Sequence, residues 1–409
     1  MSAKPLSQPY PTGTPLPTTS TLPTLFTPLK IRSLTLPNRI IVAPMGMYSA
    51  PHNGHLSPFH LPHVTQFALR GAALTIMEAT AVLAAGRTSP LDAGLYLDSH
   101  IAGMKEVVDA VHALGQKIGI QLNHAGRKAS GMPLERGMDA RIANKEEGGW
   151  PEEVVGASKL RWQEGYVEPR EMEEGDFEEV VTGFVRAAER AVEAGFDVIE
   201  IHAAHGYLLS SFLSPSSNTR PDKYGGSFAN RTRLLLRIIT SLRSAIPATM
   251  PLFVRISATD WMTHTPSAPQ WTLTDSINLA HELDGLGVDL LDVSSGSNNL
   301  LQQIPPHAEY QIDLASSIRS SLRGAGKTML VGAVGRIDNA LIARDTVQLN
   351  AAGDAKADAA LVGRQFLRDP SFVLNVAEAL GVEVQWPSQY WRAAPLVGKV
   401  SERDAKRVY

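Results

Sequence analysis

The sequence repeats one unit, in which an amphipathic stretch is followed by a glycine and then by a short, continuous apolar run. The first clear copy places apolar side chains at intervals of three or four positions, at Ile101, Met104, Val108, Val111 and Leu114. This spacing predicts a helix with one buried face. Gly115 can end that helix in the left-handed conformation, and residues 118–122 then read as a strand. Residues 177–201 and 279–293 repeat the same order of elements.

Continuous apolar runs are typical of parallel strands, which are buried on both faces. Helical patterns separate most of the candidate strands, which lie at residues 39–45, 74–80, 117–123, 196–202, 252–257, 288–293, 328–332 and 357–363. Strands and helices in alternation predict right-handed βαβ units, and eight such units close naturally into a (β/α)8 TIM barrel. The alternative is a doubly wound open sheet. It needs no eighth strand, and the glycine fingerprint that it would carry after its first strand is absent.

The same pattern divides the chain into three parts. Residues 1–24, rich in Pro, Thr and Ser, predict a flexible tail that lies over the surface, residues 25–385 form the barrel, and residues 386–409 are a C-terminal extension. The tail has neither the apolar core of a signal peptide nor the arginines of a transit peptide, so a cytoplasmic location is expected. The long connections 124–175 and 258–271 fall on the C-terminal face of the barrel, either as lids or as ordinary surface insertions.

Composition excludes several classes of function. The chain has 409 residues, a net charge of -3 and 44% hydrophobic residues, enough for a large core. The near-neutral balance gives no electrostatic footprint for nucleic acid, and no apolar run is long enough to span a membrane. The sequence contains no cysteine, which excludes disulfides, thiolate metal sites, iron–sulfur clusters and a cysteine nucleophile.

Candidate chemistry gathers after the fourth strand, where His202, His205 and Tyr207 lie within six positions. Two imidazoles and a phenol are groups that donate hydrogen bonds or protons. The two histidines are also candidate metal ligands, but no Asp or Glu stands beside either of them, so no metal is expected. Each residue alone could be structural. The functional interpretation rests on their convergence with other polar strand ends at one rim.

Glycine-rich loops follow the seventh and eighth strands and favour a phosphate site. Residues 332–336 and the pair Gly363 and Arg364 offer backbone N–H groups and a guanidinium to an anion, at the usual phosphate position of a TIM barrel. Either loop alone could serve only as a turn. Arg255, on the fifth strand, could neutralise a barrel carboxylate such as Glu78 or Glu200.

These residues together resemble the Old Yellow Enzyme family of FMN-dependent ene-reductases, and most closely its YqjM-like, or thermophilic-like, branch. The resemblance covers about residues 25–392. The motifs that carry it are LPNRI at 36–40, APM at 43–45 with Tyr48, HAGRK at 124–128, IHAAHGY at 201–207, YGGS at 224–227, VGAVG at 331–335, GR at 363–364 and RDP at 368–370.

The resemblance implies FMN as the cofactor and NADPH as the hydride donor. The residues that it implies for FMN binding are Ala43, Pro44, Met45, Gly46 and Ala79 along the ring, Gln121 and Arg255 at the pyrimidine edge, and Gly335, Gly363 and Arg364 at the phosphate. His202 and His205 are implied to bind the carbonyl or nitro oxygen of the substrate, Tyr207 to donate a proton, and Tyr48 to border the substrate pocket. Arg392 is implied to reach the site of a neighbouring subunit, which requires a homodimer or a homotetramer.

The expected activity is therefore the NADPH-dependent reduction of activated C=C bonds in α,β-unsaturated carbonyl compounds through FMN, in a ping-pong cycle. A quinone or nitro-compound reductase is the alternative enzyme. A flavin-binding sensor without turnover is a further alternative, and Tyr207 argues against it because such a protein does not need a proton donor. A flavin-free aldolase would need a Schiff-base lysine at a strand end, and neither Lys117 nor Lys128 is well placed for that. The branch has cysteine and serine where this chain has Gly46 and Ala43, which predicts an altered flavin potential and a roomier pocket.

Overall fold

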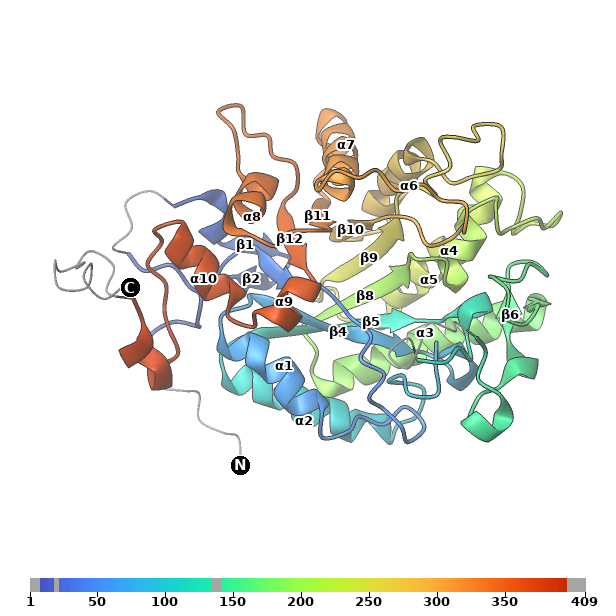
Figure 1. Ribbon diagram of the computed structural model, residues 1–409, viewed down its shortest axis with the longest axis horizontal. Coiled ribbons are helices and arrows are strands. Elements are labelled where there is room, and N and C mark those ends of the chain that lie inside the picture. The colour runs from blue at the N-terminus through green and yellow to red at the C-terminus, as the bar shows by residue number, and fades with distance from the viewer. Residues whose placement is uncertain (1–7, 18–21, 134–140, 396–409) are drawn as a thin grey trace.

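The computed structural model describes residues 8–17, 22–133 and 141–395. Its centre is a closed barrel of parallel strands, and the alternation of strand and helix places helices around the outside (Figure 1). The barrel strands are β3 (Ile40–Val42), β4 (Leu74–Ala81), β5 (Lys117–Asn123), β8 (Val198–Ala203), β9 (Leu252–Ser257), β10 (Leu290–Ser294), β11 (Leu330–Val334) and β12 (Ala359–Val362). Each predicted strand matches one of them, and pairing of β12 with β3 closes the ring. The prediction of a TIM barrel is confirmed, and the open sheet is excluded.

The outer helices arise where the sequence has helical periodicity. They are α1 (His60–Leu69), α2 (His100–Ala113), α3 (Glu174–Ala194), α5 (Phe228–Ala245), α6 (Leu273–Gly285), α7 (Tyr310–Gly324), α8 (Ala340–Val347) and α10 (Phe372–Ala379). Two short helices, α4 (Leu208–Leu213) and α9 (Arg364–Arg368), begin soon after β8 and β12. Gly115 has a φ of 77°, which gives α2 the left-handed ending that its sequence predicts.

A small hairpin closes the N-terminal end of the barrel. It consists of β1 (Leu29–Ile31) and β2 (Leu34–Leu36), which pair antiparallel. Its apolar side chains are buried in one cluster with strand residues such as Leu74, Phe253 and Leu290. Because this end is filled with side chains, the open end of the barrel is the C-terminal one, where the loops carry the polar residues.

Residues 8–17 are a packed segment of the N-terminal face, which corrects the expectation of a flexible tail for this part of the chain. The backbone N–H groups of Gly13 and Leu16 donate to the carbonyls of Gln385 and Glu383, at 2.8 Å each. The buried Asn38 side chain donates to the carbonyl oxygens of Gly13 and Gly71. Residues 1–7 and 18–21 of the predicted tail lie outside the described residues.

The two long connections carry short elements of their own. Residues 124–175 contain the 3-10 helices η3 (Gly126–Lys128), η5 (Lys145–Glu147) and η6 (Pro151–Glu153), and the paired strands β6 (Val155–Gly156) and β7 (Arg170–Glu171). The remaining short helices are η1 (Thr24–Phe26), η2 (Ala84–Gly86) and η7 (Ser388–Ala393). No helix in the described part of the chain is both long and apolar enough to cross a membrane.

Candidate active site

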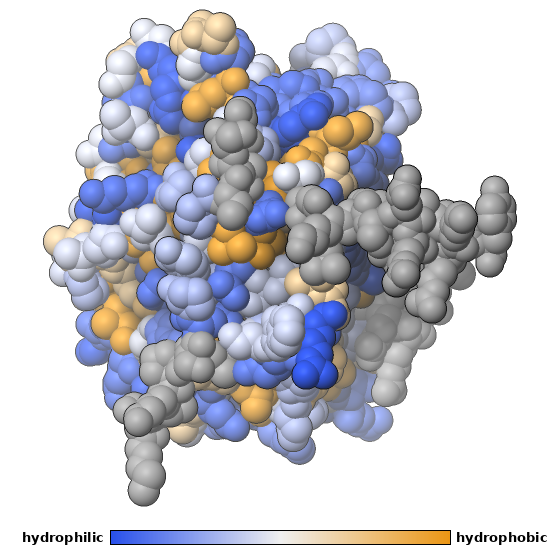
Figure 2. Space-filling view, turned by 90° about the vertical axis from the view of Figure 1, so that its left-hand side faces the viewer, coloured by the Kyte–Doolittle hydropathy of each residue, from blue (hydrophilic) through white to orange (hydrophobic). Residues whose placement is uncertain are grey.

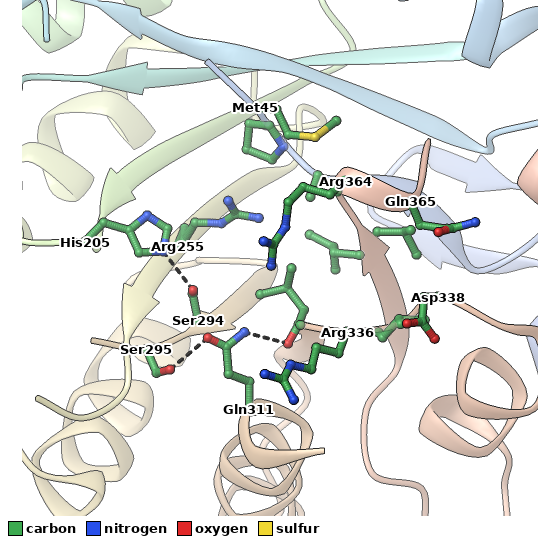
Figure 3. A pocket seen from close by; sticks show the side chains of 18 of the residues that line it. Met45, His205, Arg255, Ser294, Ser295, Gln311, Arg336, Asp338, Arg364 and Gln365 are labelled. Atoms are coloured by element: carbon green, nitrogen blue, oxygen red, sulfur yellow. Dashed lines mark hydrogen bonds between the residues drawn. The ribbon is translucent and has the colours of Figure 1, made fainter. Parts of the chain in front are cut away.

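A cavity of about 720 Å³ opens at the C-terminal ends of the strands (Figure 3). It is lined by the segment after β3, by β9 and β10, and by the ends of β11 and β12 with the loops that follow them. Seven of the ten residues expected to hold a cofactor line it, namely Ala43, Pro44, Met45, Arg255, Gly335, Gly363 and Arg364. Segments far apart in the sequence thus form one wall, because parallel barrel strands end at the same rim.

The other three expected cofactor residues lie near the cavity but are not among the residues that line it. Gln121 points into the barrel, where its amide donates to Glu200 Oε1 at 2.7 Å. Ala79 lies on β4, beside a register shift between β4 and β5. A Cβ at Gly46 would meet no atom within 4 Å, so this glycine leaves open space where a larger side chain would fit.

Arg255 indicates that this cavity binds a ligand with hydrogen-bond acceptors. It is 5% exposed, and its Nε donates to Asp292 Oδ2. Its Nη2 is buried and has no hydrogen-bond partner among the described residues. A buried N–H without an acceptor is costly, and the polar edge of a flavin pyrimidine ring offers acceptors for it. The residues present therefore fit FMN.

The loops after β11 and β12 have the geometry of an anion site. Gly335 has a φ of 113°, and a Cβ there would come within 2.4 Å of the Gln311 side chain, so only glycine fits. Figure 3 shows Arg364 extending into the cavity, and Arg336 lies on the same wall. Within the described ranges Arg364 makes no ion pair with a carboxylate, which leaves its guanidinium available to a phosphate.

His202, His205 and Tyr207 come together beside this cavity, as their spacing after the fourth strand predicts. The ring centroids of His202 and His205 are 5.1 Å apart, and those of His202 and Tyr207 are 4.9 Å apart. His205 has a φ of 61°, which turns the chain sharply after β8. The backbone N–H of His205 donates to the Ser257 hydroxyl at 2.9 Å, and its Nε2 lies 2.8 Å from the Ser294 hydroxyl.

Burial fixes the protonation of these three side chains. Burial and the neighbouring cations Arg255 and Lys128 lower the pKa of His205 to about 3, and burial with the adjacent His205 holds the pKa of His202 well below its usual value. Both imidazoles are therefore neutral near pH 7. Burial raises the pKa of Tyr207 to about 12, so its phenol keeps its proton.

The tautomer of His202 follows from its hydrogen bond. The backbone N–H of Ala204 donates to Nδ1 of His202 at 3.1 Å, so the ring proton of His202 sits on Nε2. A neutral imidazole with an occupied acceptor can only donate through its other nitrogen. His202 is therefore a hydrogen-bond donor in this site.

Tyr48 lies at the same rim, in a turn that the sequence did not lead us to expect. Its φ is 50°, and the backbone N–H of Met47 before it donates to the Glu78 carboxylate at 2.8 Å. Glu78 in turn pairs with His60 rather than with Arg255. Burial and the nearby Tyr207 phenol raise the pKa of Tyr48, so it also stays protonated.

Four residues of the site were missed by sequence reasoning. Asp292 and Ser294 hold Arg255 and His205, and Thr88 contacts the Tyr207 side chain. Lys128 was considered only as a Schiff-base lysine, and its donation to the carbonyl oxygens of His205 and Ser297, at 2.7 and 2.6 Å, was not predicted. A usable signal existed for Asp292, because it is an acidic residue inside an apolar strand that neighbours the strand of Arg255.

Arg392 does not line the cavity of its own chain. It lies on η7, and the chain just before η7 pairs with the N-terminal segment at Pro15 and Val384. An apolar groove of about 320 Å³ lies beside it, lined by Leu16, Leu374, Val382, Trp386, Trp391 and neighbouring residues. Figure 2 views the side of the molecule on which α10 lies, and it shows apolar residues near the middle of that side, among hydrophilic ones.

No group of three or more His, Cys, Asp or Glu side chains that could hold a metal ion is found among the described residues. The donors at the site are the guanidinium of Arg255, the imidazoles of His202 and His205, and the Tyr207 phenol.

Comparison with known proteins shows the family of the chain. The family model described as the NADH:flavin oxidoreductase / NADH oxidase family matches residues 24–383. An NADH:flavin oxidoreductase of Gibberella zeae is 43% identical over 373 residues, covering 89% of this chain and 88% of that protein. The NADPH dehydrogenase of Bacillus subtilis is 40% identical over 369 residues, covering 90% of this chain and 98% of that protein.

Solved structures share the barrel. Morphinone reductase superposes with a TM-score of 0.69 at 26% identity, covering 90% of this chain and 92% of that one. A 2-naphthoyl-CoA reductase complex superposes with a TM-score of 0.74 at 23% identity and covers 87% of this chain and 52% of that one, which shows a common fold. The chain therefore belongs to the NADH:flavin oxidoreductase / NADH oxidase family and is an FMN-dependent oxidoreductase of the Old Yellow Enzyme type.

Proposed function

We propose that the protein is an NADPH-dependent ene-reductase that reduces the C=C bond of α,β-unsaturated carbonyl compounds. The observation that carries the proposal is the convergence of two neutral imidazoles and a protonated phenol beside a cavity that fits FMN. When bound, FMN accepts a hydride from NADPH and passes it to the β-carbon of the alkene. The residues of this chain supply the rest of the chemistry.

The imidazoles bind the substrate oxygen. Negative charge develops on that oxygen when the β-carbon receives hydride, and donors placed there in advance stabilise it. His202 donates through Nε2. His205 donates through Nδ1 when the Ser294 hydroxyl donates to its Nε2. Both donors are neutral imidazoles near pH 7, because their pKa values are low, so they stabilise this charge through hydrogen bonds.

Tyr207 delivers the proton to the α-carbon. Its phenol is protonated at every pH at which the protein is expected to work, because burial raises its pKa to about 12. The proton goes to carbon as the charge on the substrate oxygen collapses, so a single tyrosine completes the saturation of the bond. A flavoprotein that only bound its cofactor would have no use for a proton donor at this position.

Reduction of a quinone or a nitro compound is the alternative activity for the same site. The space left by Gly46, where a Cβ would meet no atom within 4 Å, is the observation that favours it, because it admits a flat ring. Such acceptors take both reducing equivalents on heteroatoms. They therefore do not need a proton delivered to carbon by Tyr207.

The variant Tyr207→Phe separates these activities. We expect it to slow reoxidation by 2-cyclohexenone by about 10²- to 10⁴-fold, the usual contribution of a positioned general acid, and to leave flavin reduction by NADPH nearly unchanged. Stopped-flow absorbance measures the two half-reactions separately. Tyr10→Phe, on the 44% exposed Tyr10 of the N-terminal segment, is the matched control. Equal loss in both half-reactions would count against the assignment of Tyr207 as proton donor.

A further inference from the structure

Two carboxylates lie inside the barrel next to Arg255, and the proposed chemistry uses neither of them. Glu200 on β8 and Asp292 on β10 are each 0% exposed, and Arg255 on β9 lies between their strands. Asp292 and Arg255 stand opposite each other in the strand register. The three side chains thus form a cluster with one positive group and two acidic ones beneath the cavity.

The contacts of the two carboxylates differ. Asp292 Oδ2 accepts directly from Nε of Arg255, whereas Glu200 Oε1 lies 3.8 Å from that nitrogen and accepts from Gln121 at 2.7 Å. The second oxygen of each carboxylate has no hydrogen-bond partner among the described residues. Asp292 is therefore the counterion of Arg255, and Glu200 has only a neutral amide donor.

The charges around Glu200 indicate its protonation state. One guanidinium compensates one carboxylate, and a second buried anion without a cation is costly in a low-dielectric interior. Among the described residues, the groups that act on Glu200 are Asp292 from β10, Arg255 from β9 and the neutral Gln121 from β5. His202, on the strand of Glu200 itself, is neutral, and Glu78 on β4 is paired with His60.

The direction of the Glu200 pKa agrees with this count. Burial and the neighbouring Asp292 raise the pKa of Glu200 to about 8, against the opposing effects of Arg255 and Gln121. Burial also raises the pKa of Asp292, but its direct contact with Arg255 opposes that rise. Glu200 is therefore the carboxylate that keeps the proton, because it has no hydrogen-bonded ion pair with Arg255.

We propose that Glu200 is a positioning residue that holds a proton beneath the flavin site, so that Arg255 keeps a single counterion, Asp292, and its charge remains available to the cofactor. Arg255 lines the cavity, its Nη2 has no hydrogen-bond partner among the described residues, and Figure 3 shows the side chain directed into the cavity. Negative charge gained by a bound flavin is stabilised by Arg255. Ionisation of Glu200 at higher pH would add a negative charge there and oppose it.

The inference concerns the cofactor and does not depend on which substrate the enzyme reduces. It predicts that the midpoint potential of bound FMN falls more steeply with pH once Glu200 begins to ionise. In Glu200→Gln, which has the shape of the protonated acid, the potential should equal that of the wild type at pH 7, and the extra fall at alkaline pH should be absent. Spectroelectrochemical titration between pH 6 and pH 9.5 measures both.

Asp292→Asn is the matched variant. Removal of the Asp292 charge makes Glu200 the only counterion of Arg255, so Glu200 should lose its proton at lower pH and the steeper fall should vanish from the alkaline range. A potential at pH 7 that is clearly higher in Glu200→Gln than in the wild type would overturn the proposal, because it would mean that Glu200 is already ionised.

Infrared difference spectroscopy of the FMN-bound protein, recorded as the pH is changed, provides a second, direct readout. The wild type at pH 7 should show the carbonyl stretch of a buried protonated carboxylic acid, which disappears as pH rises and is missing from Glu200→Gln and from Asp292→Asn. Absence of that band in the wild type would refute the proposal even if a variant failed to fold. Failure to reduce enones would affect the proposed function and leave this inference standing.

Discussion

His205 shows how a single partly buried residue combines stability with chemistry. Its imidazole is partly buried near Arg255 and Lys128, and both its ring and its backbone N–H lie against serine hydroxyls. The same surroundings that keep it a neutral donor also make its protonation costly. The electrostatics of the site are therefore expected to appear in the stability of the whole protein.

The pH dependence of folding tests this link. The folded pKa of His205, about 3, lies below the unfolded value of about 6.5, so the stability gained from the neutral imidazole is present above pH 6.5 and is lost as pH falls toward 3. Between pH 7 and pH 4 this residue should account for a loss of about 3 kcal/mol. Urea unfolding of the wild type and of His205→Gln at both pH values should show a smaller loss in the variant.

The exposed His264 provides the control for this experiment. His264→Gln should lose as much stability on acidification as the wild type does. If His205→Gln also lost as much as the wild type, then the imidazole of His205 would not be the neutral group that the structure indicates.

The sequence predicted which residues meet at the rim but not what holds them. His202, His205 and Tyr207 could be named because polar residues at the end of an apolar strand are conspicuous. Ser294 and Thr88 could not, since serine and threonine are common in loops and their partners lie 89 and 119 positions away in the chain. Such contacts depend on how the barrel strands are aligned, which apolar periodicity does not encode.

At the scale of elements, the barrel strands were predictable because buried parallel strands are continuous apolar runs. The β1–β2 hairpin was not predicted, since its strands have only three residues each. The order of residues 8–17 was missed for a different reason. The segment is held by backbone hydrogen bonds to residues 383–385, and a composition rich in Pro and Thr gives no sign of such a partner.

Asn38 links these elements, and its substitution tests the role of the packed N-terminal segment. Its side chain is 0% exposed, donates to the carbonyls of Gly13 and Gly71, and accepts from the N–H of Ile40. Asn38→Ala leaves these buried groups unpaired, so it should reduce the free energy of unfolding by about 1–3 kcal/mol.

Thermal or urea unfolding measures the effect of Asn38→Ala, and Gln303→Ala, at an exposed amide, should change stability by less than about 0.5 kcal/mol. Limited proteolysis adds a local readout, because release of residues 8–17 should expose them to cleavage. An Asn38→Ala protein as stable and as resistant as the wild type would show that this segment contributes little to the fold.

At the scale of the whole molecule, Arg392 raises the question of assembly. We propose that it acts in the site of a neighbouring subunit, as its resemblance implies, because it does not line the cavity of its own chain. The apolar groove beside it, which includes the 65% exposed Trp391, is suited to contact with a second copy.

Subunit mixing tests this proposal. Arg392→Ala and Tyr207→Phe should each reduce enone turnover severely when purified alone. Reassembled together, they should form mixed dimers in which one site has both native residues, so that up to about a quarter of the sites recover activity by random pairing. Recovery on mixing, with sedimentation velocity to show the dimer, is the expected result. No recovery in verified mixed dimers would place Arg392 outside the partner's site.

The visible spectrum of the purified protein tests the cofactor and the activity together, when it is recorded without oxygen before and after NADPH and again after 2-cyclohexenone. The account predicts a flavin band that bleaches with NADPH and returns with the enone. A band that bleaches and then returns only with a quinone or a nitro compound would contradict the proposed substrate class. No flavin band, even after incubation with FMN, would contradict the account as a whole.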